Sequence, residues 1–391
     1  MPWPFSRKSL AVLSQDTDET SSSASTRFAF RLFRELVRSD EASNLFFSPS
    51  SVMMCLTMVH ELASGETRRA MTEALEIASL DAARIEAEIA VLKTAFRERV
   101  DAQVAIANSL WLSTHSQIAT ELATKLRRSY QSELTTLDFS ADDAVGIINA
   151  WVDTQTRSKI RKIVDELSPL AALIAINAVY FKGAWVRPFP VELTRDGPFT
   201  AAAGHVKQLS MMLQSGTYRY YEDKQLQMAV LPYKGDLSMV VVLPALGTDG
   251  KEFSLSVSSG SWESWFAQSK HMEGTIQLPR FRVDYEAPLK SVLSVLGMRR
   301  AFDPSLAQFE AIQAEKPPVW IDEVIHRAMT EVNEEGTEAA AVTGVFMPCM
   351  SAMNQKPRRQ FSMIVNRPFF VVIRDEATKT ILFMGWIADP R

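Results

Sequence analysis

The sequence of 391 residues contains two cysteines, Cys55 and Cys349, and five histidines. Two cysteines cannot form the disulfide framework of a small secreted domain, and no cysteine or histidine has the spacing of a metal site. Cys55 lies in an apolar helical run and is expected to be an inert core residue, whereas Cys349 is expected to be exposed and open to oxidation. We expect neither a metal nor another cofactor.

The sequence also lacks long runs of apolar residues and long runs of basic residues. No stretch approaches the 18 apolar residues of a membrane-spanning helix, and with a net charge of −4 and no long basic run there is no electrostatic basis for a nucleic acid or membrane partner. Residues 9–13 are too short for the apolar core of a signal peptide, and no Asn-x-Ser/Thr glycosylation acceptor occurs. These absences favour a cytoplasmic localisation, with the extracellular space as the close alternative.

The motifs of common enzyme classes are absent. There is no Gly-x-Ser-x-Gly, no phosphate-binding glycine loop and no His-Glu-x-x-His helix. His326 lies in a strand-like stretch, where a buried histidine usually satisfies hydrogen bonds. The sequence therefore does not predict an enzyme.

What is present is enough apolar material for a large core, since 47% of the residues are hydrophobic. Periodicity predicts a first helix capped by Thr26 and further helices at 52–59, 84–100, 118–130 and 148–152. Strands are predicted at 104–112, 171–181, 226–231, 237–244 and 276–283, a short helix after Pro288, and a final hairpin at 369–374 and 380–386. Helices early and antiparallel strands late indicate an α+β domain over residues 26–391, preceded by a polar tail at 1–25.

One segment, 331–356, reads EVNEEGTEAAAVTGVFMPCMSAMNQK and is unusual for a loop, because small, weakly apolar residues replace the expected turn residues. Alternate positions from Thr337 to Val345 are small or β-branched, whereas Glu338 belongs to the other set. Side chains alternate between faces along a strand, so the first set suits the inside of a sheet and Glu338 suits water. The apolar run 346–351 then suits attack by a protease. A flexible Ala/Gly-rich connector or a short surface helix is the alternative interpretation.

Residues 334–341, EEGTEAAA, resemble the hinge of the reactive-centre loop of an inhibitory serpin. Other serpin-like motifs follow in family-like order and spacing: NLFFSPSS at 44–51, NAWV at 149–152 with Thr156 and KI at 159–160, NAVYFKGAW at 177–185, LPY at 231–233, LSM at 237–239, LPRF at 278–281, HRA at 326–328, NRPFF at 366–370 and ILFMG at 381–385. Each motif is weak alone. Together they make residues 26–391 similar to the serpin superfamily.

The resemblance implies a serpin fold, with a helical N-terminal half, a large central mostly antiparallel sheet, further sheets and an exposed reactive-centre loop at about residues 334–357. The chain departs from the family pattern at Leu62 and Ser158, where glycine is usual or common, at Trp386, where a basic residue is common, and at Val342, where a smaller residue is usual. Val342 falls on the solvent side of an inserted strand and should be tolerated there.

The resemblance also implies site residues. Those of the hinge are Glu334, Glu335, Gly336, Thr337, Glu338, Ala339, Ala340 and Ala341. A polar cluster beneath the central sheet, the shutter, consists of Ser48, Ser51, Asn177 and His326, and Trp185 lies in the breach, at the top of the sheet, where insertion begins. In the mechanism of the family a protease attacks the loop, and cleavage lets the hinge insert into the sheet before the acyl-enzyme is hydrolysed.

Family spacing from Gly336 predicts Met350–Ser351 as the scissile bond, with Cys349 or Met347 as the next candidates for the residue before it. Methionine suits the apolar primary pocket of chymotrypsin-like or elastase-like serine proteases, and Lys356 is too far downstream to suit a trypsin-like one. We expect the protein to be a monomeric, irreversible serine protease inhibitor. A non-inhibitory serpin with a carrier, chaperone or storage role, and cross-class inhibition of a cysteine protease, stay open.

The stretch 84–99 contains Arg84, Lys93, Arg97 and Arg99, cations of the kind that bind a glycosaminoglycan. Glu86, Glu88 and Glu98 interrupt these cations, so a solvated face of mixed charge is the preferred interpretation.

Overall fold

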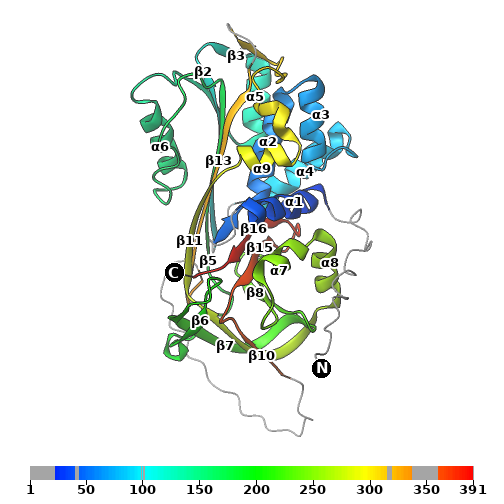
Figure 1. Cartoon of the computed structure of the whole chain (residues 1–391), viewed down its shortest axis with the longest axis vertical. Coiled ribbons are helices and arrows are strands. Elements are labelled where there is room, and N and C mark those ends of the chain that lie inside the picture. The colour runs from blue at the N-terminus through cyan, green and yellow to red at the C-terminus, as the bar shows by residue number, and fades with distance from the viewer. Residues whose placement is uncertain are drawn as a thin grey trace, which may run out of the picture.

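The computed structural model describes residues 23–39, 44–97, 99, 102–314, 319–336 and 360–390. Strands of one sheet run along the long axis of the molecule, most of the helices pack beside its upper half, and a second group of strands forms the lower half (Figure 1). The helices of this part of the chain are α1 (Ala24–Ser39), α2 (Pro49–Leu62), α3 (Gly65–Ala74), α4 (Ala82–Ala95), α5 (Thr120–Tyr130), α6 (Ala144–Gln155), α7 (Gly250–Ser256), α8 (Ser259–Gln268) and α9 (Lys290–Val295), with the 3-10 turns η2 (Val191–Leu193) and η3 (Met298–Phe302).

The central sheet has the strand order β11-β13-β5-β2-β4. Its strands are β2 (Ala102–Ser113), β4 (Glu133–Leu137), β5 (Leu173–Gly183), β11 (Phe281–Pro288) and β13 (Ile321–Val332). β5 and β13 are parallel to each other, whereas their outer neighbours β2 and β11 are antiparallel to them. The two middle strands therefore point the same way, although they are far apart in sequence.

The second large sheet has the order β1-β16-β15-β9-β8-β7-β10-β14, with β6 paired to β7. Its strands are β1 (Leu45–Phe47), β6 (Arg195–Thr200), β7 (Val206–Glu222), β8 (Leu226–Tyr233), β9 (Leu237–Pro244), β10 (Lys270–Pro279), β14 (Phe361–Ile364), β15 (Phe369–Asp375) and β16 (Ile381–Ile387), and a separate pair is formed by β3 (Ser116–Ile118) and β12 (Ile312–Ala314). The described strand pairs of this sheet are antiparallel except for β10–β14, whereas the central sheet is mixed.

The two faces of the central sheet pack against different helices. α6 covers one face, while α2, α4, α5 and α9 lie on the other (Figure 1). Ile148 and Val152 of α6 join Ile176 and Tyr180 of β5 in a small separate core, and the main core fills the opposite side. The uninterrupted apolar run of β5 follows from this arrangement, because the strand is buried on both faces.

Helix boundaries follow capping chemistry. Ser48 caps α2 by accepting a hydrogen bond from Ser51 N, and Pro49 occupies the first turn. The prediction that Thr26 caps the first helix is wrong: α1 begins at Ala24, and the Ser23 hydroxyl accepts from Thr26 N at 3.2 Å. The helix predicted at 84–100 begins at Ala82 instead and ends at Ala95.

The single strand predicted at 276–283 is in fact two strands. β10 ends at Pro279 and β11 begins at Phe281, and the two belong to different sheets. Arg280 lies between them, and its backbone N–H donates to Ser210 O at 2.9 Å. An apolar pattern in sequence does not reveal such a crossing, because Leu278 and Phe281 are both buried on either side of it.

Three of the four positions that depart from the serpin pattern are described. Leu62 is fully buried at the end of α2, and Trp386 packs on Phe253 with ring centroids 6.2 Å apart. Ser158 has a φ of 60°, a left-handed conformation that favours glycine and explains why glycine is common there. Val342 lies outside the described residues.

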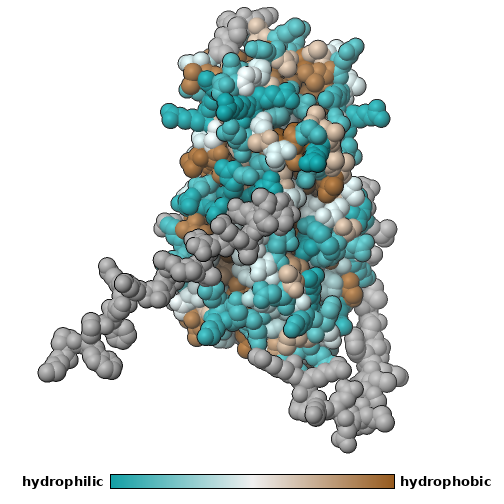
Figure 2. All heavy atoms as spheres, turned by 90° about the vertical axis from the view of Figure 1, so that its right-hand side faces the viewer, coloured by the Kyte–Doolittle hydropathy of each residue, from teal (hydrophilic) through white to brown (hydrophobic). Residues whose placement is uncertain are grey.

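Figure 2 shows the side of the molecule that lies on the right in Figure 1. On the part of this surface formed by described residues, hydrophilic side chains prevail and hydrophobic ones are interspersed among them. Scattered exposed apolar residues of this kind are normal for globular proteins. No helix among the described residues has the length and apolar character needed to cross a membrane.

Candidate functional site

The chain reverses direction directly after β13. Asn333 and Gly336 pair with each other through two backbone hydrogen bonds, and the side chain of Asn333 accepts from Glu335 N at 3.1 Å. Gly336 also forms an antiparallel bridge to Ala184, the residue that follows β5. The first part of the predicted hinge, Glu334 to Gly336, therefore already lies antiparallel to the extension of β5. The hinge residues 337–341 lie outside the described residues.

Gly336 cannot be replaced without strain, for two reasons. Its φ of 129° is rarely adopted by other residues, and a Cβ atom on it would lie 2.0 Å from the carbonyl oxygen of Gly183. The close approach of the returning chain to the end of β5 thus depends on a missing side chain.

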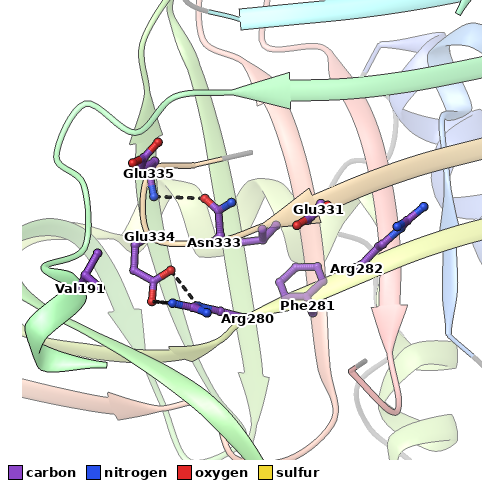
Figure 3. Close-up of a pocket in the computed structure, with 9 residues that line it drawn as sticks. Val191, Arg280, Phe281, Arg282, Glu331, Asn333, Glu334 and Glu335 are labelled. Carbon is purple, nitrogen blue, oxygen red and sulfur yellow. Dashed lines mark hydrogen bonds and ion pairs between the residues drawn. The ribbon is translucent and has the colours of Figure 1, made fainter. Parts of the chain in front are cut away.

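The carboxylate of Glu334 fixes this turn to the rest of the molecule (Figure 3). Arg280 donates to it from Nε at 2.8 Å and from Nη2 at 2.6 Å, and the Thr194 hydroxyl donates at 2.5 Å. Burial alone would raise the pKa of Glu334, but these hydrogen bonds outweigh burial and lower its pKa below the ordinary value. The backbone of Glu334 is held as well, since its carbonyl accepts from Phe189 N at 2.8 Å.

Trp185 packs where the turn meets the sheet. Its indole ring stacks on Tyr233 with centroids 4.0 Å apart, and its Nε1–H donates to the carbonyl of Asn333 at 2.9 Å. Its backbone N–H donates to Glu335 O at 3.0 Å, so one buried residue holds two residues of the turn. A pocket of about 330 Å³ opens beside this turn, between Val191, Arg280 and the residues 331–335.

Lower in the sheet, the structure brings together the four residues of the predicted polar cluster. His326 Nδ1 lies 2.5 Å from Asn177 Oδ1, and His326 Nε2 accepts from Ser48 N at 3.1 Å. Asn177 Nδ2 donates to the hydroxyl of Ser51. All four residues are buried, and the acceptor role of Nε2 places the proton of the neutral imidazole on Nδ1, from which it is donated to Asn177.

The two nitrogens of His326 are thus both used in structural hydrogen bonds. Burial lowers the pKa of His326 to about 3, so the ring is neutral near pH 7. A histidine held in this way cannot serve as the base of a nucleophilic site without first breaking its contacts to Asn177 or Ser48. Burial likewise raises the pKa of Cys55 to about 12, which agrees with an inert thiol.

Sequence reasoning missed three residues of these contacts. Asn108 of β2 pairs in register with Asn177 and accepts a hydrogen bond from its Nδ2, so a row of polar side chains crosses β13, β5 and β2. A lone asparagine inside the strand predicted at 104–112 is the signal that could have revealed it. Arg280 and Thr194 carried no such signal, because their partnership with Glu334 joins residues far apart in sequence.

The remaining predicted site residues, Met350 and Ser351 of the scissile bond and Cys349 and Met347 as its alternatives, lie outside the described residues. So does Glu98, at the end of the mixed-charge stretch 84–99. Arg97 and Arg99 of that stretch point to Asp375 rather than forming a basic face on the helix.

Comparison with known proteins agrees with this geometry. A sequence model described as "Serpin (serine protease inhibitor)" matches residues 23–390. The chain is 31% identical to a leukocyte elastase inhibitor of Xenopus tropicalis, covering 95% of this chain and 100% of the relative. It is 33% identical to an uncharacterized serpin-like protein of Thermococcus kodakarensis, covering 97% and 88%. The native state of tengpin, a thermophilic serpin, superposes with a TM-score of 0.87 at 25% identity, covering 97% of this chain and 96% of that one.

The chain belongs to the serpin (serine protease inhibitor) family.

Proposed function

We propose that this serpin is an irreversible, suicide-substrate inhibitor of serine proteases, and not an enzyme. The observation that carries the proposal is the parallel pairing of β5 with β13, next to a turn that has already reversed the chain. A strand that continued from this turn into the sheet would be antiparallel to both neighbours. One parallel contact would become two antiparallel ones, and antiparallel pairing is slightly more stable per residue.

The registers on the two sides of such a strand agree. Gly336 lies opposite both Ala184 and Asn333, so a continuing strand would place Ala339 beside Phe181 on one side and Thr330 on the other. Phe181 and Thr330 are partners of each other in the present sheet. The same count places Thr343 between Asn177 and His326. A new strand thus fits the register that β5 and β13 share from Ile174 to Phe181, since their pairing shifts only between Ile321 and Glu323.

The inward side chains of this strand suit the space available. In the register above, Thr337, Ala339, Ala341, Thr343 and Val345 share the face of Ala328 and His326, which is fully buried. Small side chains keep the cost of entry low in a close-packed interior. Thr343 would separate Asn177 from His326, and its hydroxyl offers a hydrogen-bond partner to groups that would otherwise be left unsatisfied at about 1–3 kcal/mol each.

Insertion of about 15 residues, at roughly 3.3 Å per residue, would create a strand about 50 Å long. The gain in hydrogen bonds and buried side chains makes the uncleaved fold metastable, and release of stored strain on proteolysis is a recognised switch type. The attached protease is carried along and distorted before its acyl-enzyme is hydrolysed. The rate of insertion relative to hydrolysis decides between inhibitor and substrate.

The proposed scissile bond is Met350–Ser351, and the proposed targets are chymotrypsin-like or elastase-like serine proteases. The similarity to leukocyte elastase inhibitors supports the second class. Cross-class inhibition of a cysteine protease stays an alternative, because the same trap would act on a thioester. The cytoplasmic address and the monomeric state also stay predictions.

The test is to incubate the protein with chymotrypsin, elastase, trypsin and a papain-like protease and to look for an SDS-stable complex. We expect a complex with chymotrypsin or elastase, cleavage after Met350, and a higher melting temperature for the cleaved protein. Ala339→Arg should give cleavage without a complex, because the charged side chain would enter the buried face. Cleavage of the unmodified protein by every protease with no complex formed would favour a non-inhibitory serpin instead.

A further inference from the structure

A second pocket, of about 430 Å³, lies on the α6 side of the central sheet. The segment 158–162, which follows α6, forms one wall. The other lining residues come from three neighbouring strands: Tyr180 of β5, Arg327, Met329 and Glu331 of β13, and Arg282 of β11. Since Tyr180 and Met329 are register partners, the pocket straddles the seam between β5 and β13.

The lining is strongly cationic in a chain whose net charge is −4. Against the single carboxylate of Glu331 it presents five basic side chains: Lys159, Arg161, Lys162, Arg282 and Arg327. Charges of one sign gathered in a concave site raise the local concentration of oppositely charged ligands.

Two of these cations already have carboxylate partners. Arg327 donates to Asp284 at 2.8 Å and to Glu286 at 3.2 Å, and Lys162 pairs with Asp165.

The two remaining arginines differ. Within the described part of the chain, neither Arg161 nor Arg282 has a carboxylate within ion-pair distance, and the Arg282 guanidinium contacts Met329 Sδ at 4.0 Å. Both residues are exposed and line the pocket.

We propose that this pocket binds a compact oligophosphate, a ligand with the charge and size of inorganic triphosphate. The planar guanidinium matches phosphate oxygens with two parallel hydrogen bonds, and the neighbouring lysines add point charges. The volume is in the range of small-molecule sites, roughly 300–1,000 Å³. Phosphate groups of this kind occur in free oligophosphates and in nucleoside triphosphates.

A ligand in the pocket would oppose the separation of β5 from β13. This consequence rests on the proposed function. A strand inserted between β5 and β13 would move β13 and β11 away from β5 by about 4.8 Å. In the register given above, Ala340 would then lie between Tyr180 and Met329, in the middle of the pocket floor. A ligand that contacts both sides binds the closed sheet better, and linkage requires that it shifts the balance toward the closed sheet.

The binding test uses the intact protein and calorimetric titration with inorganic tripolyphosphate at about 50 mM ionic strength, where charge interactions are weakly screened. We expect saturable 1:1 binding, and an affinity at least about 10-fold lower for the double variant Arg161→Gln/Arg282→Gln, since a charge-assisted hydrogen bond contributes about 1.5–3 kcal/mol. Arg299→Gln, an exposed arginine of η3 outside the pocket, is the matched control.

Sulfate at equal ionic strength controls for screening, and an ATP arm distinguishes the two sources of phosphate. Tighter binding of ATP than of tripolyphosphate would assign the site to nucleotides, and equal or weaker binding would assign it to the free oligophosphate. Absence of binding, or equal affinity for the double variant and Arg299→Gln, would overturn the proposal.

The coupling test measures the stoichiometry of inhibition of chymotrypsin for each variant with and without tripolyphosphate. The ligand should raise the number of serpin molecules cleaved per protease inhibited for the unmodified protein but not for the double variant. Binding without such a change would overturn the coupling while the site stands. If no protease forms a complex, the proposed function fails, and the calorimetric result is unaffected.

Discussion

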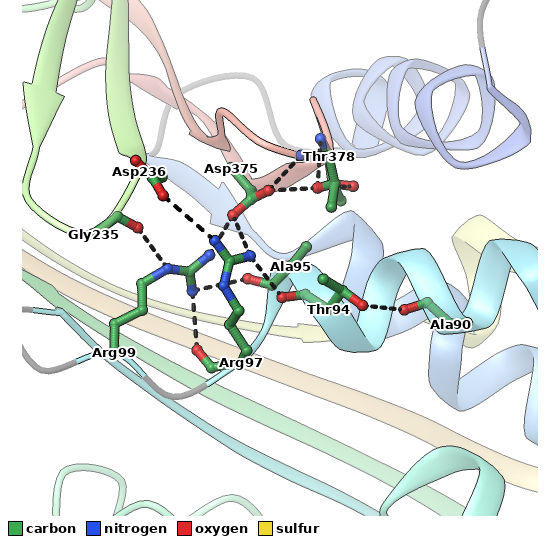
Figure 4. A network of polar contacts seen from close by, with 10 residues as sticks. Ala90, Thr94, Ala95, Arg97, Arg99, Gly235, Asp236, Asp375 and Thr378 are labelled. Carbon is green, nitrogen blue, oxygen red and sulfur yellow. Dashed lines mark hydrogen bonds and ion pairs between the residues drawn. The ribbon is translucent and has the colours of Figure 1, made fainter.

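Arg99 and Asp375 form an ion pair in which the two side chains are 4% and 0% exposed, respectively. The pair joins the connection between α4 and β2 to the turn of the β15–β16 hairpin (Figure 4). Asp375 also accepts from Arg97 at 3.1 Å and from Thr378 N at 2.7 Å, and Arg99 Nε donates to Gly235 O at 2.7 Å. Two segments distant in sequence meet at this carboxylate, and Arg99 joins a third segment to them through Gly235.

The first prediction concerns this carboxylate. Asp375→Asn should lower the free energy of unfolding by about 3 kcal/mol, because removal of one partner leaves the buried guanidinium of Arg99 without a counter-charge. The midpoint of urea unfolding measures the loss. Asp236→Asn is the control from the same network: this carboxylate is 77% exposed and lies 3.9 Å from Arg97, so its loss should change stability by less than about 0.5 kcal/mol. Equal effects of the two variants would contradict the burial argument.

The second prediction concerns the anchor of the hinge. Glu334→Gln should weaken the contact with Arg280 and lower the free energy of unfolding by about 2 kcal/mol, because a buried carboxylate loses a charge-assisted bidentate contact. Glu73→Gln, in an exposed pair with Arg69, should have almost no effect. Amide hydrogen exchange of the segment 333–336 should also speed up in Glu334→Gln. Unchanged exchange there would show that the carboxylate does not hold the turn.

The third prediction concerns pH. Burial lowers the pKa of His326 to about 3 and that of His60 to about 4, both below the value of 6.5 expected in the unfolded chain. Between these values the unfolded state binds more protons than the folded state, so stability falls as the pH is lowered from about 6.5 toward 4, by at most about 1.4 kcal/mol per pH unit for each histidine.

Urea midpoints at about pH 7 and about pH 5 measure this dependence. His326→Gln should be less stable than the unmodified protein at about pH 7, yet lose less stability on acidification. His271→Gln, at an exposed position, should keep the full dependence on pH. If His326→Gln also kept the full dependence of stability on pH, the buried imidazole would not be the source of that dependence.

The fourth prediction concerns target choice. Met350→Arg should convert the inhibitor from chymotrypsin-like or elastase-like targets to trypsin-like ones, because the acidic primary pocket of trypsin requires a cation. The second-order rate constants of inhibition for chymotrypsin, elastase and trypsin measure the change. Met347→Arg is the matched control and should leave the preference unchanged. A switch by Met347→Arg and not by Met350→Arg would move the scissile bond.

The fifth prediction concerns oxidation. Peroxide should slow the inhibition of chymotrypsin-like and elastase-like proteases, because methionine sulfoxide is polar and no longer suits an apolar primary pocket. Met350→Leu should retain inhibition and resist peroxide. An unchanged rate for the oxidised unmodified protein would refute the idea.

Much of the architecture was readable from local sequence. The strand containing Asn177, which is buried on both faces, and the final hairpin follow from apolar periodicity and turn chemistry, which act over a few residues. The small side chains at alternate positions from Thr337 onward likewise predicted a segment able to form a strand, because the alternation of side chains between two faces follows from the order of residues in the chain.

Other features of the structure depend on contacts between segments that are far apart in sequence. The pairing of Glu334 with Arg280, the break between β10 and β11, and the row from His326 through Asn177 to Asn108 depend on which strands become neighbours. The alternation of residues along a segment shows which side chains share a face, but it does not show which strand becomes the neighbour of that segment. The sequence by itself thus predicted a strand-forming segment and its inward residues, whereas the tertiary structure decided that β5 and β13 pair in parallel, since strand pairing satisfies backbone groups that are remote along the chain.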